Sequence, residues 1–419
     1  MPTFRTLRLI IPLCALALSA PASAAASGGL AEVQADLSSQ LALAGPHDGA
    51  YVYDLTGGTA LFSERARSMR PPASVEKLYT ATAALELLGP SARLETTVLG
   101  VGHLAPGGVW EGSLYLRGGG DPTFGDSRFI REHYGGVGAS ISALARQLAR
   151  VQGIHQVTGS IYGDESYLDP LRGEPSSGYS FDPFLEGTLS ALAFDRGESG
   201  REHGAHAPAA YAARRLRQAL ASDGVSIHGT SGAASTPAGA VALAAAPSPT
   251  ISQLLGLMLP PSDNFFAEML LKDLGARLGG AGTTAAGARV VAHTIGALLA
   301  IHPRVVDGSG LSPSDRTSPA QVVELLVKLA PTPAGAVLRE HMAVAGRTGT
   351  LALRMRGTGA AGRCQGKTGT LTGASNLVGY CQSAGGRLLA FAIFTDGIST
   401  SAAHVFQDHI AITLADSRF

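Results

Sequence analysis

A chain of 419 residues with 45% hydrophobic and 15% charged residues is long enough for two or three domains and has the composition of an ordinary globular protein. Its 32 basic and 32 acidic residues cancel, so no overall field draws it to nucleic acid or to an anionic membrane surface. We therefore expect no nucleic-acid partner.

The N-terminal residues have the features of a secretory signal peptide. Two arginines precede an apolar run from Leu9 to Leu18, and Ala22-Ser23-Ala24 offers a small-x-small cleavage site. The apolar run is too short to form a stable membrane-spanning helix, and no later run is long enough. We predict a signal peptide over residues 1–24, cleavage near Ala24, secretion into the periplasm or the extracellular cell wall, and no transmembrane anchor.

Loss of the signal peptide would leave Cys364 and Cys381 in an exported protein, where two cysteines commonly form a disulfide. The runs GRCQGKTGTL and SNLVGYCQS are typical of two strands joined by a turn near Thr372-Gly373. A hairpin centred there puts Cys364 opposite Cys381, so we predict a disulfide between them. Two free, buried cysteines are the alternative.

The other elements follow in chain order. Residues 51–63 contain two apolar runs around a Thr-Gly-Gly turn, which predicts a hairpin. A helix is expected from Ser74 to Leu88, where Gly89-Pro90 would end it, and its apolar character on most sides predicts burial. Short strand-like runs then alternate with glycine- and proline-rich turns as far as residue 204. Further elements are expected as helices near residues 208–222, 250–259, 264–280 and 319–329, three strands within residues 362–396, and a final helix over residues 401–416.

Helices mixed with an antiparallel meander favour an α+β fold. We predict a discontinuous domain formed by residues 28–95 and 205–419. A mainly β domain of residues 96–204 would be inserted into it.

The stretch PPASVEKLYT holds the first candidate for chemistry, Ser74 and Lys77. One helical turn apart, the two side chains lie on one face and can touch. A serine hydroxyl is a weak nucleophile that needs an adjacent base, and a lysine can be that base only if its pKa falls from about 10.4 toward neutrality. The positive end of the helix dipole would favour an oxyanion nearby. A capped helix followed by a surface lysine gives the same letters, so the pattern alone is weak.

The use of lysine across the chain strengthens this interpretation. The only lysines are Lys77, Lys272, Lys328 and Lys367, and every other basic residue is arginine. Arginine cannot lose its proton in a protein, so such sparing use suggests that lysine is kept where a titratable or compact cation is required. Chance retention is the alternative.

Two further motifs contain residue types common in active sites. Ser262-Asp263-Asn264 follows two prolines and opens a helix, although a plain N-cap has the same composition. Lys367-Thr368-Gly369-Thr370 lies on the first strand of the C-terminal meander. Glycine weakens a strand unless something approaches its backbone closely, so we interpret this strand as the edge along which a substrate binds; a strand running into its turn is the alternative. Arg347-Thr348-Gly349-Thr350 imitates the motif, but a basic, glycine-rich segment follows it, so we favour Lys367.

In this order, S-x-x-K, S-D-N and K-T-G resemble the signature set of penicillin-binding proteins and class A β-lactamases. More of the chain resembles the low-molecular-mass serine D-Ala-D-Ala carboxypeptidase/endopeptidases of the PBP4 type. The resemblance implies a penicillin-binding/β-lactamase-like transpeptidase domain, in which helices flank an antiparallel sheet and a large insertion separates the first two motifs. It rests on PPASVEKLYTATAALELLG, YLRGGGDPTF, LEGTLSALAFDRG, SDNFFAEMLLKDLG, DGSGLS and GKTGTLTGASNLVGY.

The resemblance also implies a role for each catalytic position. Ser74 would attack the carbonyl between two D-alanines while Lys77 takes its proton. The backbone N–H groups of Ser74 and Thr370 would form the oxyanion hole. Ser262 and Lys367 would relay a proton to the leaving amine. Water would then hydrolyse the acyl-enzyme, whereas penicillin, which mimics the substrate, would acylate Ser74 and leave slowly.

Binding of the substrate would use the second and third motifs. Asn264 would hold the peptide carbonyl and Lys367 the terminal carboxylate. The substrate-binding residues would also include Asp263, Thr368, Gly369 and Thr370. The implied partners are peptidoglycan stem peptides ending in D-Ala-D-Ala and β-lactam antibiotics, with no cofactor and no metal. Trimming of a terminal D-alanine and cutting of D-Ala cross-links use the same site, so both activities stay open.

Three alternatives are weighed against this interpretation. A β-lactamase shares the motifs but needs a glutamate to hydrolyse its acyl-enzyme quickly, and neither Glu268 nor Glu324 lies in an E-x-x-L-N pattern. A non-catalytic envelope protein that binds peptidoglycan would have a degenerate site, whereas these motifs are intact. A zinc peptidase could use His203 and His206, but no third ligand follows them, and we interpret them as loop residues.

Overall fold

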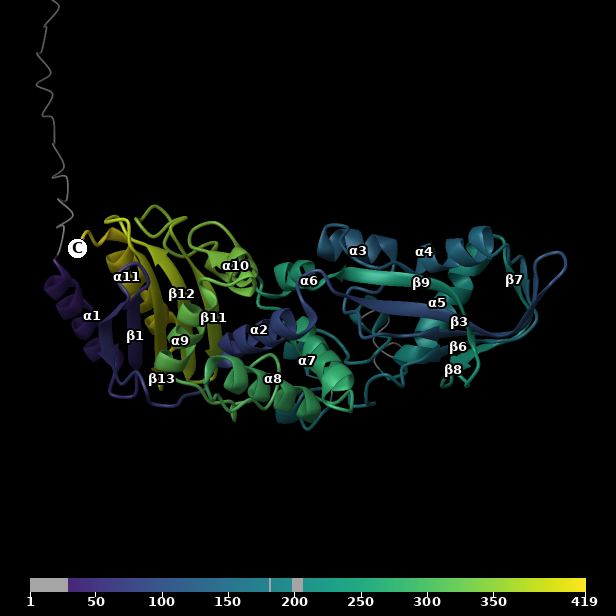
Figure 1. Ribbon diagram of the computed structural model, residues 1–419, viewed down its shortest axis with the longest axis horizontal. Helices are drawn as coiled ribbons and strands as arrows, with labels where there is room; N and C mark the ends of the chain where they lie inside the picture. The colour runs from purple at the N-terminus through teal and green to yellow at the C-terminus, as the bar shows by residue number, and fades with distance from the viewer. Residues whose placement is uncertain (1–28, 181, 198–205) are drawn as a thin grey trace, which may run out of the picture.

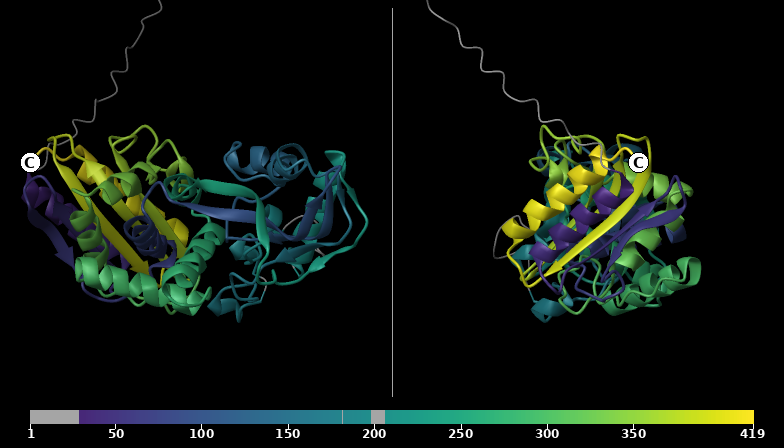
Figure 2. Two further views of the ribbon diagram at one scale, coloured as in Figure 1. Left: turned by 45° about the vertical axis from the view of Figure 1, so that its right-hand side comes forward. Right: turned by 90° about the vertical axis from the view of Figure 1, so that its left-hand side faces the viewer.

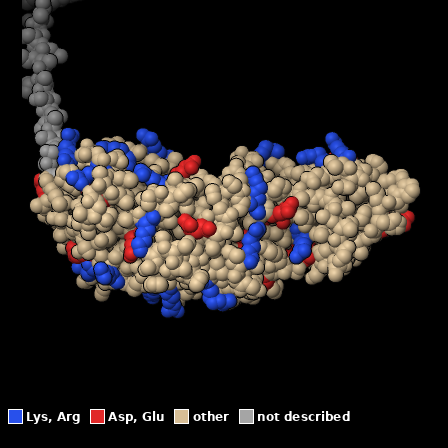
Figure 3. Space-filling view, viewed as in Figure 1, with Lys and Arg blue, Asp and Glu red and all other residues tan. Residues whose placement is uncertain are grey.

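The computed structural model describes residues 29–180, 182–197 and 206–419, and the predicted signal peptide lies outside these residues. The molecule is elongated, with one β-sheet at each end and the helices α2, α6 and α7 between them (Figure 1). Basic and acidic side chains are interspersed over the face seen in Figure 3. No single helix in the described part of the chain is both long and apolar enough to cross a membrane; one bent pair, α9 with α10, reaches those criteria only when taken together.

The first sheet is antiparallel throughout and has the strand order β10-β11-β12-β13-β1-β2. Side chains of β12 and β13 alternate between two hydrophobic cores, one on each face, because successive residues of a strand point to opposite sides. Helices cover both faces, which is why these strands read as almost continuous apolar runs. The strand bounds are Gly49–Asp54 for β1, Thr59–Glu64 for β2, Ala343–Val344 for β10, Cys364–Leu371 for β11, Ala374–Gln382 for β12 and Leu388–Asp396 for β13.

Helices α1 and α11 lie side by side over one face of this sheet (Figure 2). Residues of α2 and α9 share the core on its other face. The helix bounds are Leu30–Ala44 for α1, Lys77–Leu88 for α2, Ser127–Tyr134 for α3, Ile141–Arg146 for α4, Pro208–Ser222 for α5, Ile251–Met258 for α6, Asn264–Leu278 for α7, Thr284–Leu299 for α8, Pro319–Leu329 for α9, Pro333–Glu340 for α10 and Thr400–Asp416 for α11.

The second sheet is mixed and lies in sequence between Ser74 and Ser262. Its strands β3, β4 and β9 pair antiparallel, whereas β5, β6, β7 and β8 pair in parallel. The strand bounds are Arg93–Ala105 for β3, Val109–Arg117 for β4, Gln156–Val157 for β5, Ile161–Asp164 for β6, Ser226–Ile227 for β7, Ser231–Ala233 for β8 and Val241–Thr250 for β9.

This sheet continues past residue 204, the predicted end of the insertion. Strand β9 pairs with β3, and α5 packs in the same core as β4 and β6. The sequence signal was weak there because β7 and β8 have only two and three residues, and β9 reads VALAAAPSPT, with few β-branched residues. The region also contains α3 and α4, which were not predicted from the sequence.

Several predictions about the first sheet are confirmed. The hairpin expected within residues 51–63 is β1–β2, and the three C-terminal strands are β11, β12 and β13. Cys364 and Cys381 are direct partners in the β11–β12 register and form a disulfide. The fold is α+β, as expected.

Candidate active site

The first motif lies where the chain enters α2. A single 3-10 turn, Ala73–Glu76, precedes the α-helix, which begins at Lys77 rather than at Ser74. Ala73 has a left-handed backbone with φ of 48°, a conformation that is costly for a residue with a side chain. Pro71 and Pro72 precede this turn, and proline is poorly tolerated inside a helix. The strained turn therefore fixes the position of Ser74 at the start of the helix.

Lys77 is fully buried and its ammonium nitrogen has three partners. Nζ donates to Ser74 Oγ at 3.0 Å, to Asn264 Oδ1 at 2.6 Å and to the Ser309 carbonyl at 2.7 Å. Two of these partners are carbonyl oxygens, which can only accept. A neutral amine would keep its two N–H donors on them and turn its lone pair toward the Ser74 hydroxyl.

Burial lowers the pKa of Lys77 to about 8, and nearby carboxylates oppose that change. Those carboxylates, largest effect first, belong to Asp307, Glu268, Asp263 and Glu186. Burial also raises the pKa of Glu76, well above its usual range, and that of Glu268, to about 8. Protonation of these acids limits the negative charge around Lys77, so the lysine can lose its proton near neutral pH.

The second motif opens α7. Asp263 is the N-cap and its Oδ1 accepts from the backbone N–H of Phe266 at 3.0 Å. Ser262 has a left-handed backbone with φ of 70°. Asn264, the first residue of the helix, uses both ends of its amide, since Oδ1 accepts from Lys77 and Nδ2 donates to the Phe184 carbonyl at 2.7 Å.

The third motif lies on β11. Lys367 is fully buried and its Nζ donates to Ser262 Oγ at 2.6 Å. Burial lowers its pKa well below the usual range, and the charge of Lys77 adds to the effect. Thr370 is exposed at the end of the motif, while Thr368 is buried and donates its hydroxyl to Thr350 Oγ1 at 2.8 Å. Two Ser–Lys pairs therefore converge at this end of the sheet.

The structure gives a packing reason for glycine at position 369. A Cβ atom there would lie 2.5 Å from the Pro72 carbonyl oxygen and 3.2 Å from the Ser74 backbone nitrogen. The close neighbour is thus the turn that carries Ser74. Glycine lets β11 approach that turn, which places the third motif beside the first. The β10 pairing ends at Gly366, so beyond it β11 has no further strand on that side among the described residues.

Three supporting positions were not predicted as site residues. Asn376 on β12 donates from Nδ2 to the carbonyls of Pro71 and Pro72 at 3.0 and 2.8 Å and so ties the Ser74 turn to the sheet. Ser309 supplies a carbonyl to Lys77. Thr350, from the segment set aside as an imitation of the third motif, contacts Thr368, and its N–H donates to the Pro260 carbonyl at 3.0 Å.

The loop around Ser309 is held by two buried carboxylates. Glu268 Oε1 accepts from the N–H groups of Gly308 and Ser309 at 2.9 and 2.7 Å. Asp307 accepts from the N–H groups of Gly310 and Ser312 at 2.7 and 2.6 Å. These bonds fix the carbonyl that Lys77 contacts. The only signal for them in the sequence was the DGSGLS segment.

The remaining candidates lie away from this site. Lys272 is buried in an ion pair with Asp169, and Lys328 forms a surface pair with Glu324. His203 lies outside the described residues. No group of three or more metal-ligating side chains that could hold a metal ion occurs within the described ranges.

Comparison with known proteins places the chain in a family. The profile of the D-Ala-D-Ala carboxypeptidase 3 (S13) family matches residues 30–179 and 185–417. The chain belongs to this family. The D-alanyl-D-alanine carboxypeptidase of Actinomadura sp. (strain R39) is 31% identical over an alignment 495 positions long, gaps included, which covers 97% of this S13 chain and 89% of the relative. The chain is accordingly a serine-type peptidase of the D-Ala-D-Ala carboxypeptidase class, as the motifs predicted.

Solved structures show the same fold. Penicillin-binding protein 4 of Haemophilus influenzae superposes on this S13 chain with a TM-score of 0.72 at 20% identity and covers 91% of it and 98% of its own length; it has also been solved with a β-lactam. Bd3459, a predatory peptidoglycan endopeptidase of Bdellovibrio bacteriovorus, gives a TM-score of 0.56 at 17% identity, with 86% and 90% covered. The penicillin-binding/β-lactamase-like fold is confirmed.

Proposed function

We propose that this S13 enzyme removes the terminal D-alanine of peptidoglycan stem peptides through an acyl-enzyme at Ser74. The observation that carries the proposal is the fully buried amine of Lys77, 3.0 Å from Ser74 Oγ and held by two carbonyl acceptors. With a pKa lowered to about 8, that amine is a base of suitable strength for a serine hydroxyl.

In the proposed reaction, the Ser74 oxygen forms a bond to the carbonyl carbon of the penultimate D-alanine while its proton passes to Lys77 Nζ. Collapse of the tetrahedral intermediate breaks the peptide bond, and the leaving amine takes a proton through Ser262, which Lys367 contacts at 2.6 Å. The backbone N–H groups of Ser74 and Thr370 would stabilise the oxyanion. Lys367, with Thr368, Gly369 and Thr370, would bind the terminal carboxylate.

Slow hydrolysis of a penicillin adduct is part of the proposal. A fast β-lactamase needs a carboxylate that activates water at the acyl-enzyme. Glu268 is fully buried with Oε1 bonded to two backbone N–H groups, and Glu324 is paired with Lys328 at the surface. Glu268 Oε2 has no hydrogen-bond partner among the described residues, but burial raises the pKa of this carboxyl to about 8, which makes the protonated acid a poor activator of water at neutral pH. Two proteins of the same fold, one solved in complex with a β-lactam and one acylated by penicillin G, support binding of these drugs.

We also propose that the enzyme works outside the cytoplasmic membrane, after cleavage near Ala24, because its substrate is found there and the Cys364–Cys381 disulfide suits an oxidising compartment.

The activity is tested with two substrates of defined structure. Residues 25–419 should release D-alanine from a stem pentapeptide ending in D-Ala-D-Ala, detected with D-amino-acid oxidase. A cross-linked peptide dimer, followed by mass spectrometry, reports endopeptidase activity in the same preparation. Release from the pentapeptide that is lost in Ser74→Ala is the expected result. No release from either substrate, with a folded protein, would contradict the proposed function.

A further inference from the structure

An arginine of the inserted region, Arg196, forms an ion pair with Asp263 of the second motif. Arg196 Nη1 donates to Asp263 Oδ2 at 2.7 Å and Nη2 donates to Oδ1 at 3.0 Å, so the guanidinium and the carboxylate form a bidentate ion pair. Its Nε donates to the Glu186 carbonyl at 2.7 Å, and its charged group lies over the ring of Phe265 at 4.9 Å. Both side chains of the ion pair are about nine-tenths buried, at 9% and 10% exposure.

The backbone around this ion pair has an unusual conformation. Asp195, Arg196 and Glu186 all have left-handed φ values, between 49° and 59°. Such conformations persist only where the surrounding structure holds them. The loop between Glu186 and Phe184 also supplies the carbonyl that accepts from Asn264 Nδ2. Two turns of the insertion, one carrying Phe184 and the other Arg196, thus contact two consecutive residues of the second motif.

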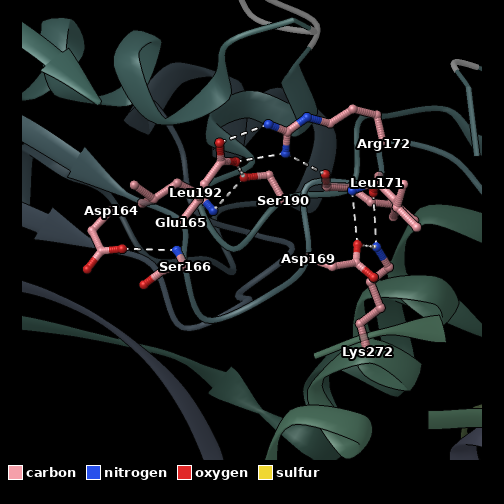
Figure 4. Close-up of polar contacts among 10 residues, drawn as sticks. Asp164, Glu165, Ser166, Asp169, Leu171, Arg172, Ser190, Leu192 and Lys272 are labelled. Atoms are coloured by element: carbon pink, nitrogen blue, oxygen red, sulfur yellow. Dashed lines mark hydrogen bonds and ion pairs between the residues drawn. The ribbon is translucent and has the colours of Figure 1, made fainter. Parts of the chain in front are cut away.

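The inserted region also holds α7 further along the helix. Lys272 Nζ donates to Asp169 at 2.7 Å and to the Leu171 carbonyl at 3.0 Å, as the close-up of Figure 4 shows. In the same view Arg172 forms a bidentate ion pair with Glu165, in which Nη1 and Nη2 each donate to a carboxylate oxygen at 2.8 Å. Arg172 therefore makes the same kind of ion pair as Arg196, with no contact to the second motif among its bonds in the described structure.

The Arg196 pair also has an electrostatic consequence. Asp263 and Glu186 are among the carboxylates whose charge favours the protonated form of Lys77. Arg196 contacts Asp263 directly and lies 3.8 Å from a Glu186 carboxylate oxygen. Its positive charge offsets theirs. Without it, Lys77 would face a larger net negative charge and would hold its proton more tightly.

We propose that Arg196 is a positioning residue for acylation of Ser74. Its bidentate ion pair with Asp263 holds Asn264 in contact with Lys77, and its positive charge limits the net negative charge around the Lys77 amine. This inference rests on the proposed function, because it assigns Arg196 an effect on the base of that reaction. The charged groups that face Lys77 from the elements around it are Glu76, Glu186, Asp263, Glu268, Asp307 and Lys367.

The experiment measures the rate of acylation by benzylpenicillin between pH 5 and 9, using intact mass. Wild-type acylation should rise with pH as Lys77 loses its proton. This rise is the acidic limb of the pH profile. Arg196→Met keeps much of the side-chain volume but removes the charge, so the midpoint of the acidic limb should move up by about one pH unit. At pH values below that midpoint, acylation should be about tenfold slower than in the wild type. Asp263→Asn, which keeps the helix cap, should move the limb to lower pH. The double variant should lie between the two.

Arg172→Met is the matched control, because it also removes an arginine from a two-bond carboxylate pair in the insertion, although Arg172 is only partly buried, at 21% exposure. It should lower the melting temperature without moving the acidic limb. Arg196→Lys keeps a positive charge but cannot form the bidentate ion pair, so it should move the acidic limb less than Arg196→Met does. If Arg196→Met does not fold, Asp263→Asn and the double variant, which leaves no charged carboxylate at position 263, still give the sign of the shift.

Two results would overturn the inference. One is an acidic limb that stays in place in Arg196→Met and Asp263→Asn. The other is a shift of equal size in Arg172→Met. Failure of the proposed function looks different, because the wild-type protein itself would then form no adduct with benzylpenicillin at any pH.

Discussion

Replacement of Lys77 by arginine is expected to slow acylation by benzylpenicillin by on the order of 1,000-fold, because general-base catalysis of this kind contributes about 10²- to 10⁴-fold. Arginine retains the positive charge and hydrogen-bond donors of lysine, but it cannot give up its proton in a protein. The amine of Lys77 is fully buried with a pKa lowered to about 8, so the wild-type enzyme has a substantial neutral fraction at pH 7 to 8. The variant would have none.

The acylation rate constant of Lys77→Arg is measured by intact mass at pH 8. Lys328→Arg is the control, because Lys328 lies at the surface in an ion pair with Glu324 and contacts no motif residue among its described bonds. Its rate should equal that of the wild type. A Lys77→Arg enzyme that is acylated within threefold of the wild-type rate would show that Lys77 acts through its charge and not as a base.

Loss of Lys367 is expected to have the second largest effect, on substrates that carry a free terminal carboxylate. Lys367→Met should lower kcat/KM for a peptide ending in D-Ala-D-Ala by on the order of 100-fold, since removal of one partner from a buried charged contact typically costs that much or more. The same substitution also removes the contact of 2.6 Å to Ser262.

Comparison with the C-terminal amide of the same peptide separates these two effects. The wild-type enzyme should prefer the carboxylate, and Lys367→Met should lose most of that preference. Lys272→Met is a matched control, because Lys272 is also fully buried but bonds to Asp169, away from the motifs. It should be destabilised yet keep the wild-type preference. An unchanged preference in Lys367→Met would contradict carboxylate binding by Lys367.

The local elements and the three motifs could be predicted from the sequence because each depends on residues that are close together in the chain. The hairpin β1–β2, the meander β11–β13 and the helix starts at 264 and 319 follow from periodicity, turns and caps. The disulfide followed from the register of a single hairpin. Ser74 with Lys77, and Lys367 with its neighbours, could be found from spacing and from the scarcity of lysine, although their roles remain our proposal.

What the sequence did not predict depends on contacts between distant segments. The pairing of β9 with β3 joins residues about 150 positions apart, and nothing local specifies it. Thr350 was set aside because its surroundings are not strand-like, yet tertiary packing brings it to Thr368. A Cβ at position 369 would meet the Ser74 turn, which is close in space but 295 residues away in the chain, so no local pattern shows this contact. Arg196 lies in the LEGTLSALAFDRG segment, which by itself assigns it no role, and its role is inferred from its partner, Asp263.

Acylation of Ser74 is tested by the intact mass of residues 25–419 after addition of benzylpenicillin, with Ser74→Ala alongside. We predict a one-to-one adduct that persists for many minutes in the wild type, maps to the peptide containing Ser74 and is absent from the variant. An adduct of equal yield in Ser74→Ala, or no adduct in a folded wild-type protein, would contradict the account.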